Sequence, residues 1–338
     1  MATITPSPVF PVNAPYTTNP AYSGTFIPTL WSKKMLVRFY QNTMLSEITN
    51  TDYEGELKNQ GDTVRIRAVP DVNIKDYEVG MNLQYEVPTP VYLDMQIDKG
   101  KYFGVKVADV LESQADISLM DMLTSEAAKQ MKIKVEDEVF FNSFITQGPH
   151  SANEGATAGI ISAAYGLGTD VAPVDQATAA NVLDAILRMS SVLDEQNVPE
   201  DGRWLVISPY DRHLLLQSEI AAAYFSGDQT SMVRTGKIGQ LDRFTVYVSN
   251  LLPRAAAGKA WVSGLSDPAA AADAATTKKR RMMVAGTKHA ISFAATINKT
   301  EPFRDQTDFG DIVRGLMIYG RKVVKPEALV TTIVGSAT

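Results

Sequence analysis

The residues of this chain that could do chemistry are few and scattered. Its three histidines each stand alone in the sequence: His150, His213 and His289. None has a second histidine or a carboxylate at the spacing of a metal site. The chain has no cysteine, which excludes disulfides and thiolate chemistry. Gly236-Lys237 and Gly258-Lys259 lack the other residues of a phosphate-binding loop. We therefore expect no cofactor and no metal.

One cluster could form a hydrolase site. Asp211 and His213 follow Ser208 closely, and this spacing would allow a nucleophile set built on His213 and Asp211. However, Ser208 directly precedes Pro209, which is typical of a helix N-cap followed by proline at the first helical position. The chain also has no Gly-x-Ser-x-Gly turn that would present a nucleophile. The pattern favours capping, and we expect no enzymatic activity.

Charge and hydropathy bound the partners. The chain has 338 residues and a formal charge of −6, which argues against a dedicated nucleic-acid binder. Its one strong charge run, Lys278 to Arg281, is expected to be a solvated loop. The sequence contains no run of 18 apolar residues, so we expect no membrane span. The first basic residue is Lys33, so the basic segment that a signal peptide requires is missing. We expect a protein made in the cytoplasm of the cell that expresses it, with no membrane partner.

Two alternating runs predict an antiparallel ribbon over 61–107. Thr63 to Val69 and Val91 to Asp98 alternate apolar and polar residues with period two. We expect Arg65 and Arg67 to lie across from Asp94 and Asp98, and we propose these four residues for contact between subunits as well. Residues 70–90 are too many for a tight turn, which favours a functional projection. Its tip mixes charge with apolar side chains, which suits docking: Asp76, Glu78, Met81, Leu83 and Tyr85.

A long helix is predicted to follow the ribbon. Ser113 to Phe144 contains neither proline nor glycine, and Met120, Leu123, Ala127, Met131 and Val135 form one apolar stripe. At 1.5 Å per residue, such a helix would be about 45 Å long and would act as a spine. We expect two opposite-charge pairs on its exposed faces. These are Lys132 with Glu136 and Lys134 with Glu138.

The N-terminal segment is predicted to be an extended arm. Residues 1–29 carry six prolines and no charge, so they should be extended, not helical. Their apolar and aromatic content is unlike a solvated tail and favours contact with a surface. The aromatic residues proposed for contact between subunits are Phe10, Tyr16, Tyr22 and Phe26. A short amphipathic helix and a lead-in segment should occupy 30–60.

Residues 150–281 are predicted to form a second, α/β domain. We expect a helix over Gln176 to Gln196, a buried strand over Trp204 to Ile207 and a helix from Pro209 to about Tyr224. The strand Phe244 to Val248 should follow, and Ala255 to Thr277 should be an alanine-rich surface loop. Strands from Met282 onward are expected to return to the long helix, which would make this domain an insertion.

The order of these parts resembles the major capsid proteins of tailed bacteriophages, the Hong Kong 97 type of fold. Local motifs carry the resemblance: Phe26-Ile27-Pro28-x-Leu30-Trp31-Ser32, Tyr53 to Glu56, Gly61 to Ile66, Thr235 to Gly239, Phe244 to Ser249 and Tyr319 to Leu329. The resemblance implies an α+β fold with an N-terminal arm (1–29), an extended E-loop hairpin (61–107) and an inserted axial domain (150–281). The peripheral domain would comprise the spine helix and returning strands (108–149 and 282–338).

The resemblance also implies the function and the partners. The chain would assemble into hexamers and pentamers of an icosahedral shell, with scaffolding, portal and decoration proteins as partners and packaged double-stranded DNA contacted non-specifically. The mild acidity suits a container, because strong DNA binding would hinder filling and release. An encapsulin-like compartment shell is the alternative within the same fold, and a hydrolase is the alternative of another class.

Overall fold

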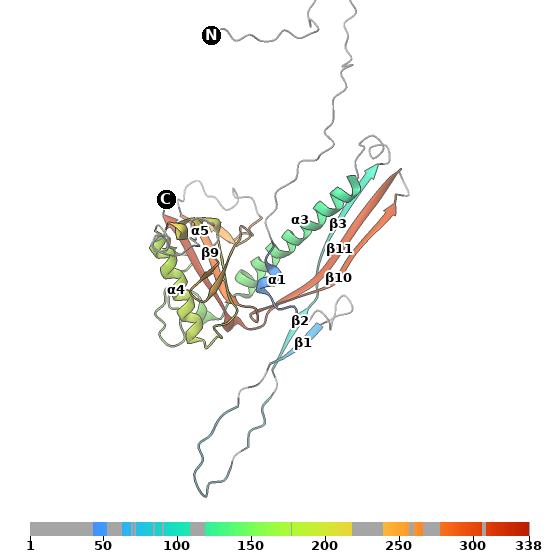
Figure 1. The fold of residues 1–338 in the computed structure, drawn as a ribbon. Coiled ribbons are helices and arrows are strands. Elements are labelled where there is room, and N and C mark those ends of the chain that lie inside the picture. Colours follow the sequence, from blue (N-terminus) through green and yellow to red (C-terminus); the bar gives the residue numbers. More distant parts are fainter. Residues whose placement is uncertain are drawn as a thin grey trace, which may run out of the picture. The chain divides into compact units, whose positions relative to one another are not determined.

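A computed structural model describes most of the chain. The described residues are 43–52, 63–68, 70, 72–83, 85–89, 91–108, 119–176, 178–217, 239–256, 260–265, 278–305 and 309–337. All of them belong to one compact unit, 39–338 (Figure 1). The predicted arm, the helix after it and the lead-in to the ribbon lie mainly outside the described residues, as do Phe10, Tyr16, Tyr22 and Phe26.

The described residues combine helices with strands, as the α+β class requires. The helices are α1 (Leu45–Ile48), α3 (Leu119–Phe141), α4 (Ala179–Glu195), α5 (Pro209–Leu216), the π-helical turn η2 (Asn142–Gln147) and the 3₁₀ turns η3 (Ser151–Asn153) and η5 (Pro326–Ala328). The strands are β1 (Thr63–Ala68), β2 (Val91–Gln96), β3 (Lys99–Ala108), β4 (Val174–Asp175), β5 (Arg203–Ile207), β6 (Gln240–Leu241), β7 (Phe244–Val248), β8 (Arg254–Ala256), β9 (Lys278–Thr287), β10 (Ile291–Arg304), β11 (Gly310–Val323) and β12 (Leu329–Ala337).

The predicted ribbon is confirmed, but part of its register is not. Strands β1 and β2 pair antiparallel, and Arg65 lies opposite Asp94 as expected. Because the strands run antiparallel and Arg65 lies opposite Asp94, Arg67 lies opposite Tyr92, while Asp98 lies beyond the end of β2 at Gln96. The carboxylate of Asp98 instead contacts the neighbouring Lys99 ammonium at 2.9 Å. The predicted pairing of Arg67 with Asp98 was therefore wrong.

A three-stranded sheet, β10-β11-β3, lies between the ribbon and α3. On one face, Val135 and Val139 of α3 form a cluster with Phe293 and Tyr319 of the sheet. On the other face, the apolar side of the ribbon packs around Ile318; these ribbon residues are Val64, Ile66, Met95 and Ile97. Strand β3, which follows the ribbon, pairs with β11 of this sheet and not with the ribbon.

The spine helix is confirmed, but its charged faces differ from the prediction. Helix α3 begins at Leu119, and η2 extends the coil to Gln147, while 109–118 lie outside the described residues. Glu136 is fully buried, so the expected exposed pair with Lys132 is wrong. Glu138 also turns inward, where it accepts a hydrogen bond from the Tyr319 hydroxyl at 2.9 Å. The buried face of this helix therefore carries carboxylates as well as apolar side chains.

The second domain is built on a seven-stranded sheet. Its strand order is β4-β12-β9-β5-β7-β6, with β8 paired to β9 (Figure 1). Helix α4, β5 and β7 lie close to their predicted ranges, and α5 begins at the predicted Pro209 but ends at Leu216, before the predicted Tyr224. Two strands that were expected to return to the spine helix, β9 and β12, lie in this sheet; only β10 and β11 return. Met282 to Ala285 are all buried, which suits a central strand better than the half-exposed edge of another sheet.

The charge run and the alanine-rich loop also differ from their predictions. Lys278 to Arg281 are the first residues of β9, and Arg280 is buried, so this run is not a solvated loop. The Arg280 guanidinium contacts the Asp170 carboxylate at 2.9 Å and lies over the Trp261 ring. Ala255 belongs to β8, within the range predicted to be a loop. A carboxylate and an aromatic ring from other segments therefore cover Arg280, which the local sequence predicts to be exposed.

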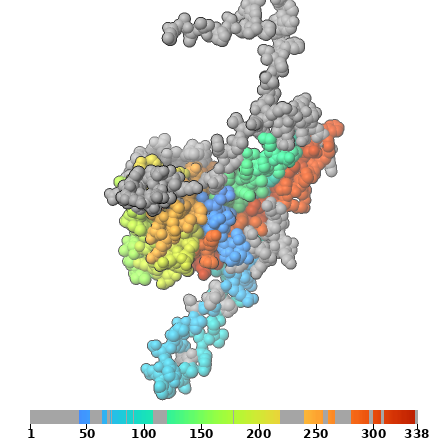
Figure 2. All heavy atoms as spheres, viewed as in Figure 1, coloured from blue at the N-terminus to red at the C-terminus, as the bar shows by residue number. Residues whose placement is uncertain are grey.

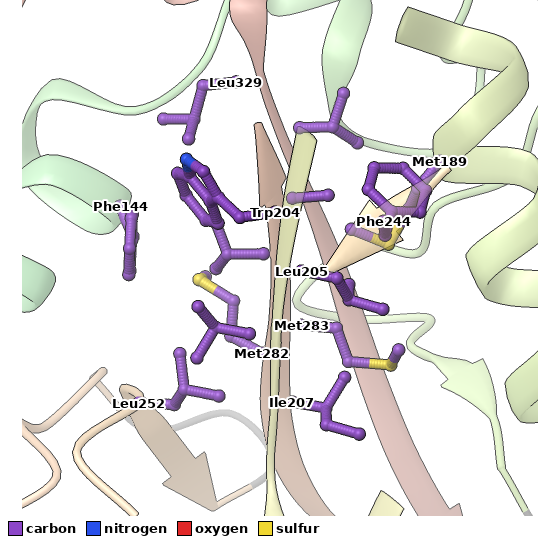
Figure 3. Close-up of a cluster of buried hydrophobic side chains, with 14 of the residues drawn as sticks. Phe144, Met189, Trp204, Leu205, Ile207, Phe244, Leu252, Met282, Met283 and Leu329 are labelled. Carbon is purple, nitrogen blue, oxygen red and sulfur yellow. The ribbon is translucent and has the colours of Figure 1, made fainter. Parts of the chain in front are cut away.

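The main core joins this sheet to the base of the spine helix. Trp204 of β5 lies beside Leu329 of β12 and faces Phe144 of η2 (Figure 3). On the other side of β5, Leu205 lies near Met189 of α4 and Phe244 of β7. Every residue of β5 is buried. One continuous apolar cluster therefore fixes the second domain to the end of the spine helix.

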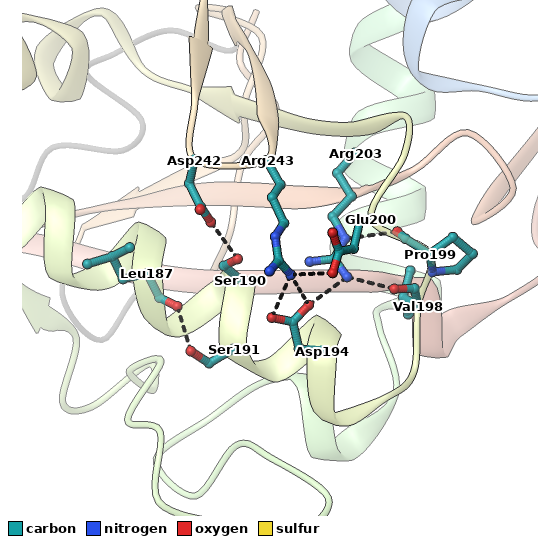
Figure 4. Close-up of polar contacts among 10 residues, drawn as sticks. All are labelled: Leu187, Ser190, Ser191, Asp194, Val198, Pro199, Glu200, Arg203, Asp242 and Arg243. Atoms are coloured by element: carbon teal, nitrogen blue, oxygen red, sulfur yellow. Dashed lines mark hydrogen bonds and ion pairs between the residues drawn. The ribbon is translucent and has the colours of Figure 1, made fainter.

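A buried arginine ties the end of α4 to the start of β5. The Arg203 side chain is fully buried and donates to the carbonyl oxygens of Val198 and Pro199 at 2.6 and 2.9 Å (Figure 4). Asp194 of α4 bridges Arg203 at 2.8 Å and Arg243 at 3.0 Å. Because a buried charge is tolerated only when it is paired, this network holds the turn between helix and strand in one conformation.

Candidate assembly surfaces

The loop between β1 and β2 exposes apolar side chains. We call residues 72–83 and 85–89 the tip loop; they contain no helix or strand. Met81, Leu83 and Tyr85, which were predicted for contact between subunits, are all exposed, Tyr85 by 87%. The predicted acidic residues Asp76 and Glu78 are exposed as well. In Figure 2 the loop stands clear of the other described atoms.

The tip loop exposes further apolar residues that the sequence analysis did not single out for contact. Ile74 and Val79 are 93% and 95% exposed, and Tyr77 is also exposed. Charged residues lie between them in the sequence. The signal in the sequence was the length of the connection between β1 and β2. A loop of this length has no second layer of structure to cover its apolar side chains. Contiguous exposed apolar surface of this kind marks a site of interaction.

A tight turn forms the end of the tip loop. The Met81 N–H donates to the Glu78 carbonyl oxygen at 3.2 Å, and Gly80 has a φ of 93°. This is the geometry of a turn that requires a left-handed residue at its third position, where glycine is favoured. The Glu78 N–H also lies 3.1 Å from the Met81 sulfur. The turn gives the end of the loop a defined shape.

The ribbon holds this loop through packing and one exposed ion pair. The Arg65 Nε donates to Asp94 Oδ1 at 3.0 Å, and its guanidinium lies over the Tyr92 ring at 5.5 Å. The hydrogen bond to Asp94 raises the pKa of Arg65, although both side chains are largely solvated. Such an exposed pair contributes little stability. The apolar contacts of the ribbon with the three-stranded sheet are therefore the main anchor.

A second exposed surface lies on the three-stranded sheet. Cross-strand register places the following side chains on the face away from α3: Tyr102, Lys106, Lys299, Glu301, Phe303, Ile312, Arg314 and Leu316. We call these residues the outer sheet face. Tyr102 is 83% exposed, and the Arg314 guanidinium lies over the Phe303 ring at 4.9 Å. Glu301 and Asp305 pair with the cations of this face. It combines apolar surface with a small excess of positive charge.

A charged network locks the spine helix to the other side of this sheet. Glu138 of α3 accepts from Tyr319 and lies 2.5 Å from the Lys101 ammonium and 3.3 Å from the Arg321 guanidinium. Burial disfavours ionisation, but the contacts with Lys101 and Tyr319 keep the pKa of Glu138 below its ordinary value. Burial and the contact with Glu138 raise the pKa of Tyr319. Helix and sheet therefore present one rigid support for the ribbon.

Glu136 holds the segment that enters the described unit from the N-terminal side. Its Oε2 accepts the backbone N–H groups of Met44 and Leu45 at 2.8 and 3.2 Å. Among the described residues, its Oε1 has no hydrogen-bond partner. Burial raises the pKa of Glu136 to about 7, against the lowering effect of the two N–H groups. The carboxyl thus joins α1 to the spine helix.

The supposed hydrolase residues form a helix cap. The Ser208 hydroxyl and the Asp211 side chain satisfy each other's backbone N–H groups in a capping box at the start of α5. Asp211 is fully buried and pairs with Arg281 at 3.1 Å, while the His213 ring contacts Gln217. The described part of the chain holds no group of His, Cys, Asp and Glu side chains that could bind a metal. It also contains no helix that is long and apolar enough to cross a bilayer.

Solved structures identify the class of fold. A chain from Mycobacterium phage Che8 matches with a TM-score of 0.68 and 24% identity, covering 92% of this chain and 97% of that one. The capsid of cyanophage P-SCSP1u matches with a TM-score of 0.67 and 16% identity, covering 94% and 96%. The mature capsid of bacteriophage PhiM1 matches with a TM-score of 0.57 and 18% identity, covering 90% and 93%. The fold is that of Hong Kong 97-type major capsid proteins.

A family comparison agrees with the fold. The family described as phage capsid protein matches residues 92–332, so this chain belongs to that family. Comparison with curated proteins found no match. The chain is thus a structural protein of the virion capsid and not an enzyme.

Proposed function

We propose that copies of this chain assemble into the hexamers and pentamers of an icosahedral phage head that encloses double-stranded DNA. The observation that carries the proposal is the tip loop, which exposes a row of apolar side chains on a well-anchored ribbon. A monomer gains nothing from this exposure, whereas burial against another copy would contribute about 1.5–3 kcal/mol per large side chain. Repeated contacts of this kind between unlike surfaces close into rings.

The outer sheet face of a neighbouring copy is the proposed receptor for the tip loop. Asp76, Glu78 and Glu86 outweigh Lys75 in the loop, whereas the outer sheet face carries a small excess of positive charge. Tyr102 and Leu316 offer exposed apolar surface for the isoleucine, valine and tyrosine side chains of the loop. Complementary charge would set the register of the two copies and raise their association rate.

Charge reversal tests this pairing. Changing Asp76 and Glu78 to Lys should abolish particles in electron micrographs, and adding Lys299→Glu with Arg314→Glu should restore them. Asp201→Lys, a reversal at an exposed turn of the second domain, is the matched control and should assemble normally. Unfolding of the unassembled subunit by urea should be alike in all variants. If the compensating changes do not restore particles, the loop docks elsewhere.

The N-terminal arm is proposed to contact neighbouring copies as well, through Phe10, Tyr16, Tyr22 and Phe26. This remains a prediction, because these residues lie outside the described part of the chain. Deleting residues 1–28 should leave a subunit that folds normally but assembles poorly. Normal shells from that truncation would show that the arm is dispensable.

Scaffolding, portal and decoration proteins, together with packaged DNA, are the other proposed partners. The formal charge of −6 supports weak, non-specific contact with DNA. A tight and salt-sensitive affinity of the free subunit for duplex DNA would contradict this proposal. Particles from the natural source should contain double-stranded DNA. Particles that hold cargo enzymes instead would support the alternative of an encapsulin-like compartment.

A further inference from the structure

A short segment, residues 44–50, joins parts of the fold that are far apart in the sequence. Its helix α1 lies beside the spine helix α3 (Figure 1), and its last residue pairs with the start of β10, where the Asn50 N–H donates to the Ile291 carbonyl oxygen at 2.8 Å. Ile48, between these two contacts, is fully buried in the main core. We call residues 44–50 the entry segment, because residues 1–43 lead directly into it. Its attachment therefore fixes the point where the N-terminal residues join the subunit.

The start of the entry segment depends on the Glu136 carboxyl for its hydrogen bonds. Met44 is the N-cap residue of α1, and its own side chain makes no capping hydrogen bond. Glu136 Oε2 instead accepts the N–H groups of Met44 and Leu45. A helix leaves its first N–H groups without partners inside the helix, so another group has to accept them when that end is buried. The Glu136 carboxyl is therefore the cap that α1 lacks in its own sequence.

The two protonation states of Glu136 suit this position differently. The side chain is fully buried, and among the described residues its Oε1 has no hydrogen-bond partner. The neutral acid leaves one polar group unpaired, whereas the carboxylate leaves a negative charge buried without a paired cation, which costs more. Ionisation therefore favours a state in which the carboxyl has moved into water. That movement takes the acceptor away from Met44 and Leu45.

Titratable side chains on the surrounding elements do not supply that cation. They are exposed, partly exposed or already bound to other groups: Glu47, Lys101, Lys132, Lys134, Asp137, Glu138, Tyr247, Lys288, His289 and Arg321. Glu47 and Lys288 form an exposed pair at 3.9 Å, and Asp137 accepts the Leu265 N–H at 3.1 Å. Burial is the largest influence on the pKa of Glu136, and the two N–H groups oppose it. Covering by the entry segment therefore controls the charge of Glu136.

We propose that the Glu136 carboxyl is a pH-sensitive latch on the entry segment: the neutral acid holds Met44 and Leu45 on the spine helix, and the carboxylate lets this first turn open. The far end stays attached, because Ile48 is buried and Asn50 is paired with β10. Since burial raises the pKa of Glu136 to about 7, the latch is complete in acid and weakens as the pH rises toward that value. It acts in the unassembled subunit and does not depend on the proposed function.

Hydrogen exchange of single amides in the unassembled full-length chain tests the latch. Protection factors, which remove the intrinsic pH dependence of exchange, should fall roughly tenfold or more at Met44 and Leu45 between pH 5.5 and 8. Dilute urea should not accelerate their exchange, because opening one turn exposes little surface. The Val206 amide of the central strand β5 is the internal control, and urea should accelerate it. If Met44 and Leu45 respond to urea as Val206 does, or show no fall with pH, no latch opens.

Two variants assign the fall to one carboxyl. Glu136→Gln keeps an acceptor for the two N–H groups but cannot ionise, so the protection factors of Met44 and Leu45 should stay constant over the same pH range. Glu47→Gln removes the exposed carboxyl of α1 itself and should keep the fall. A fall that persists in Glu136→Gln, or disappears in Glu47→Gln, overturns the proposal. If Glu136→Gln does not fold, the unmodified chain decides: the fall should level off above the pKa of Glu136, about 7, and a fall that continues belongs to another group.

Discussion

The second domain and the tip loop use the same kinds of side chain in opposite ways. Leu205 and Trp204 are at most 2% exposed in the seven-stranded sheet, whereas Leu83 is 57% and Tyr85 87% exposed in the loop. In the sheet, burial occurs when the subunit folds. In the loop, burial has to wait for another copy of the chain. The comparison separates residues that stabilise the subunit from residues whose apolar surface is available for assembly.

Truncating one aromatic residue in each region should give the largest contrast. Trp204→Ala removes a buried ring from the main core and should cost about 3–5 kcal/mol of unfolding free energy. Tyr85→Ala should change the unfolding free energy by less than about 0.5 kcal/mol, because the side chain is exposed in the subunit. Urea titration of the unassembled chain measures both values.

Assembly should rank the same two variants differently. A folded Tyr85→Ala subunit should form fewer particles in electron micrographs than the unmodified chain. Tyr210→Ala is a control, since Tyr210 is also exposed but lies on α5 of the second domain, and it should form particles like the unmodified chain. If Tyr85→Ala destabilises the subunit as much as Trp204→Ala, the division between the two regions is wrong.

Alanine at two left-handed glycines should give the next largest contrast. A methyl group on Gly168 (φ 80°) would lie 2.4 Å from the Ile333 carbonyl oxygen, so Gly168→Ala should cost at least about 1–3 kcal/mol. Gly80 (φ 93°) has no atom within 4 Å of that position, so Gly80→Ala should add no clash to its backbone strain. Thermal unfolding measures the loss of stability in each of the two variants. Equal losses would show that backbone strain alone decides the cost.

The buried Glu136 should make stability depend on pH in a defined direction. In the unfolded chain its carboxyl ionises near its ordinary pKa, whereas the folded chain keeps the proton until about pH 7. The raised pKa means that its contribution to stability is complete at low pH and is lost as the pH rises toward 7. Relative to Glu136→Gln, the unmodified chain should lose roughly 2–3 kcal/mol at most between pH 4.5 and 8. If the difference in unfolding free energy between the two chains stays constant across this pH range, the raised pKa of Glu136 is wrong.

Reversing the ribbon arginines should have the smallest effect. Arg65→Glu places a carboxylate opposite Asp94 and should lower the unfolding midpoint slightly. Arg67→Glu faces Tyr92 and should not lower it. Thermal scans of the two variants at low salt distinguish them, and the difference should shrink at high salt because both sites are exposed. An equal effect of the two reversals would mean that the register is wrong.

Local pattern was sufficient to predict much of the fold. Alternation identified β1 and β2, and α4, β5 and β7 formed close to their predicted ranges. The Ser208-Pro209 pair predicted the cap that starts α5. These features depend on neighbours in sequence. The exposed side chains of the tip loop could also be predicted, because the connection is too long to pack against its own strands.

Long-range contacts explain the misses. Nothing near Glu136 in the sequence indicates that its carboxyl caps residues 44 and 45, so an exposed pair with Lys132 was the local expectation. Likewise, Arg281 pairs with Asp211, 70 residues away, and not with a carboxylate of its own segment. The assignment of β9 and β12 to the second sheet depends on pairing with β5, which hydropathy alone does not reveal.

The position of β12 in the seven-stranded sheet has a consequence for synthesis. This strand, Leu329–Ala337, lies between β4 and β9, so the sheet cannot be completed until the last described residues have left the ribosome. At about 5–20 residues per second, β5 would wait on the order of ten seconds for that strand. During this interval the nascent chain has unpaired strand edges, so premature association between growing chains is a hazard that folding after release avoids.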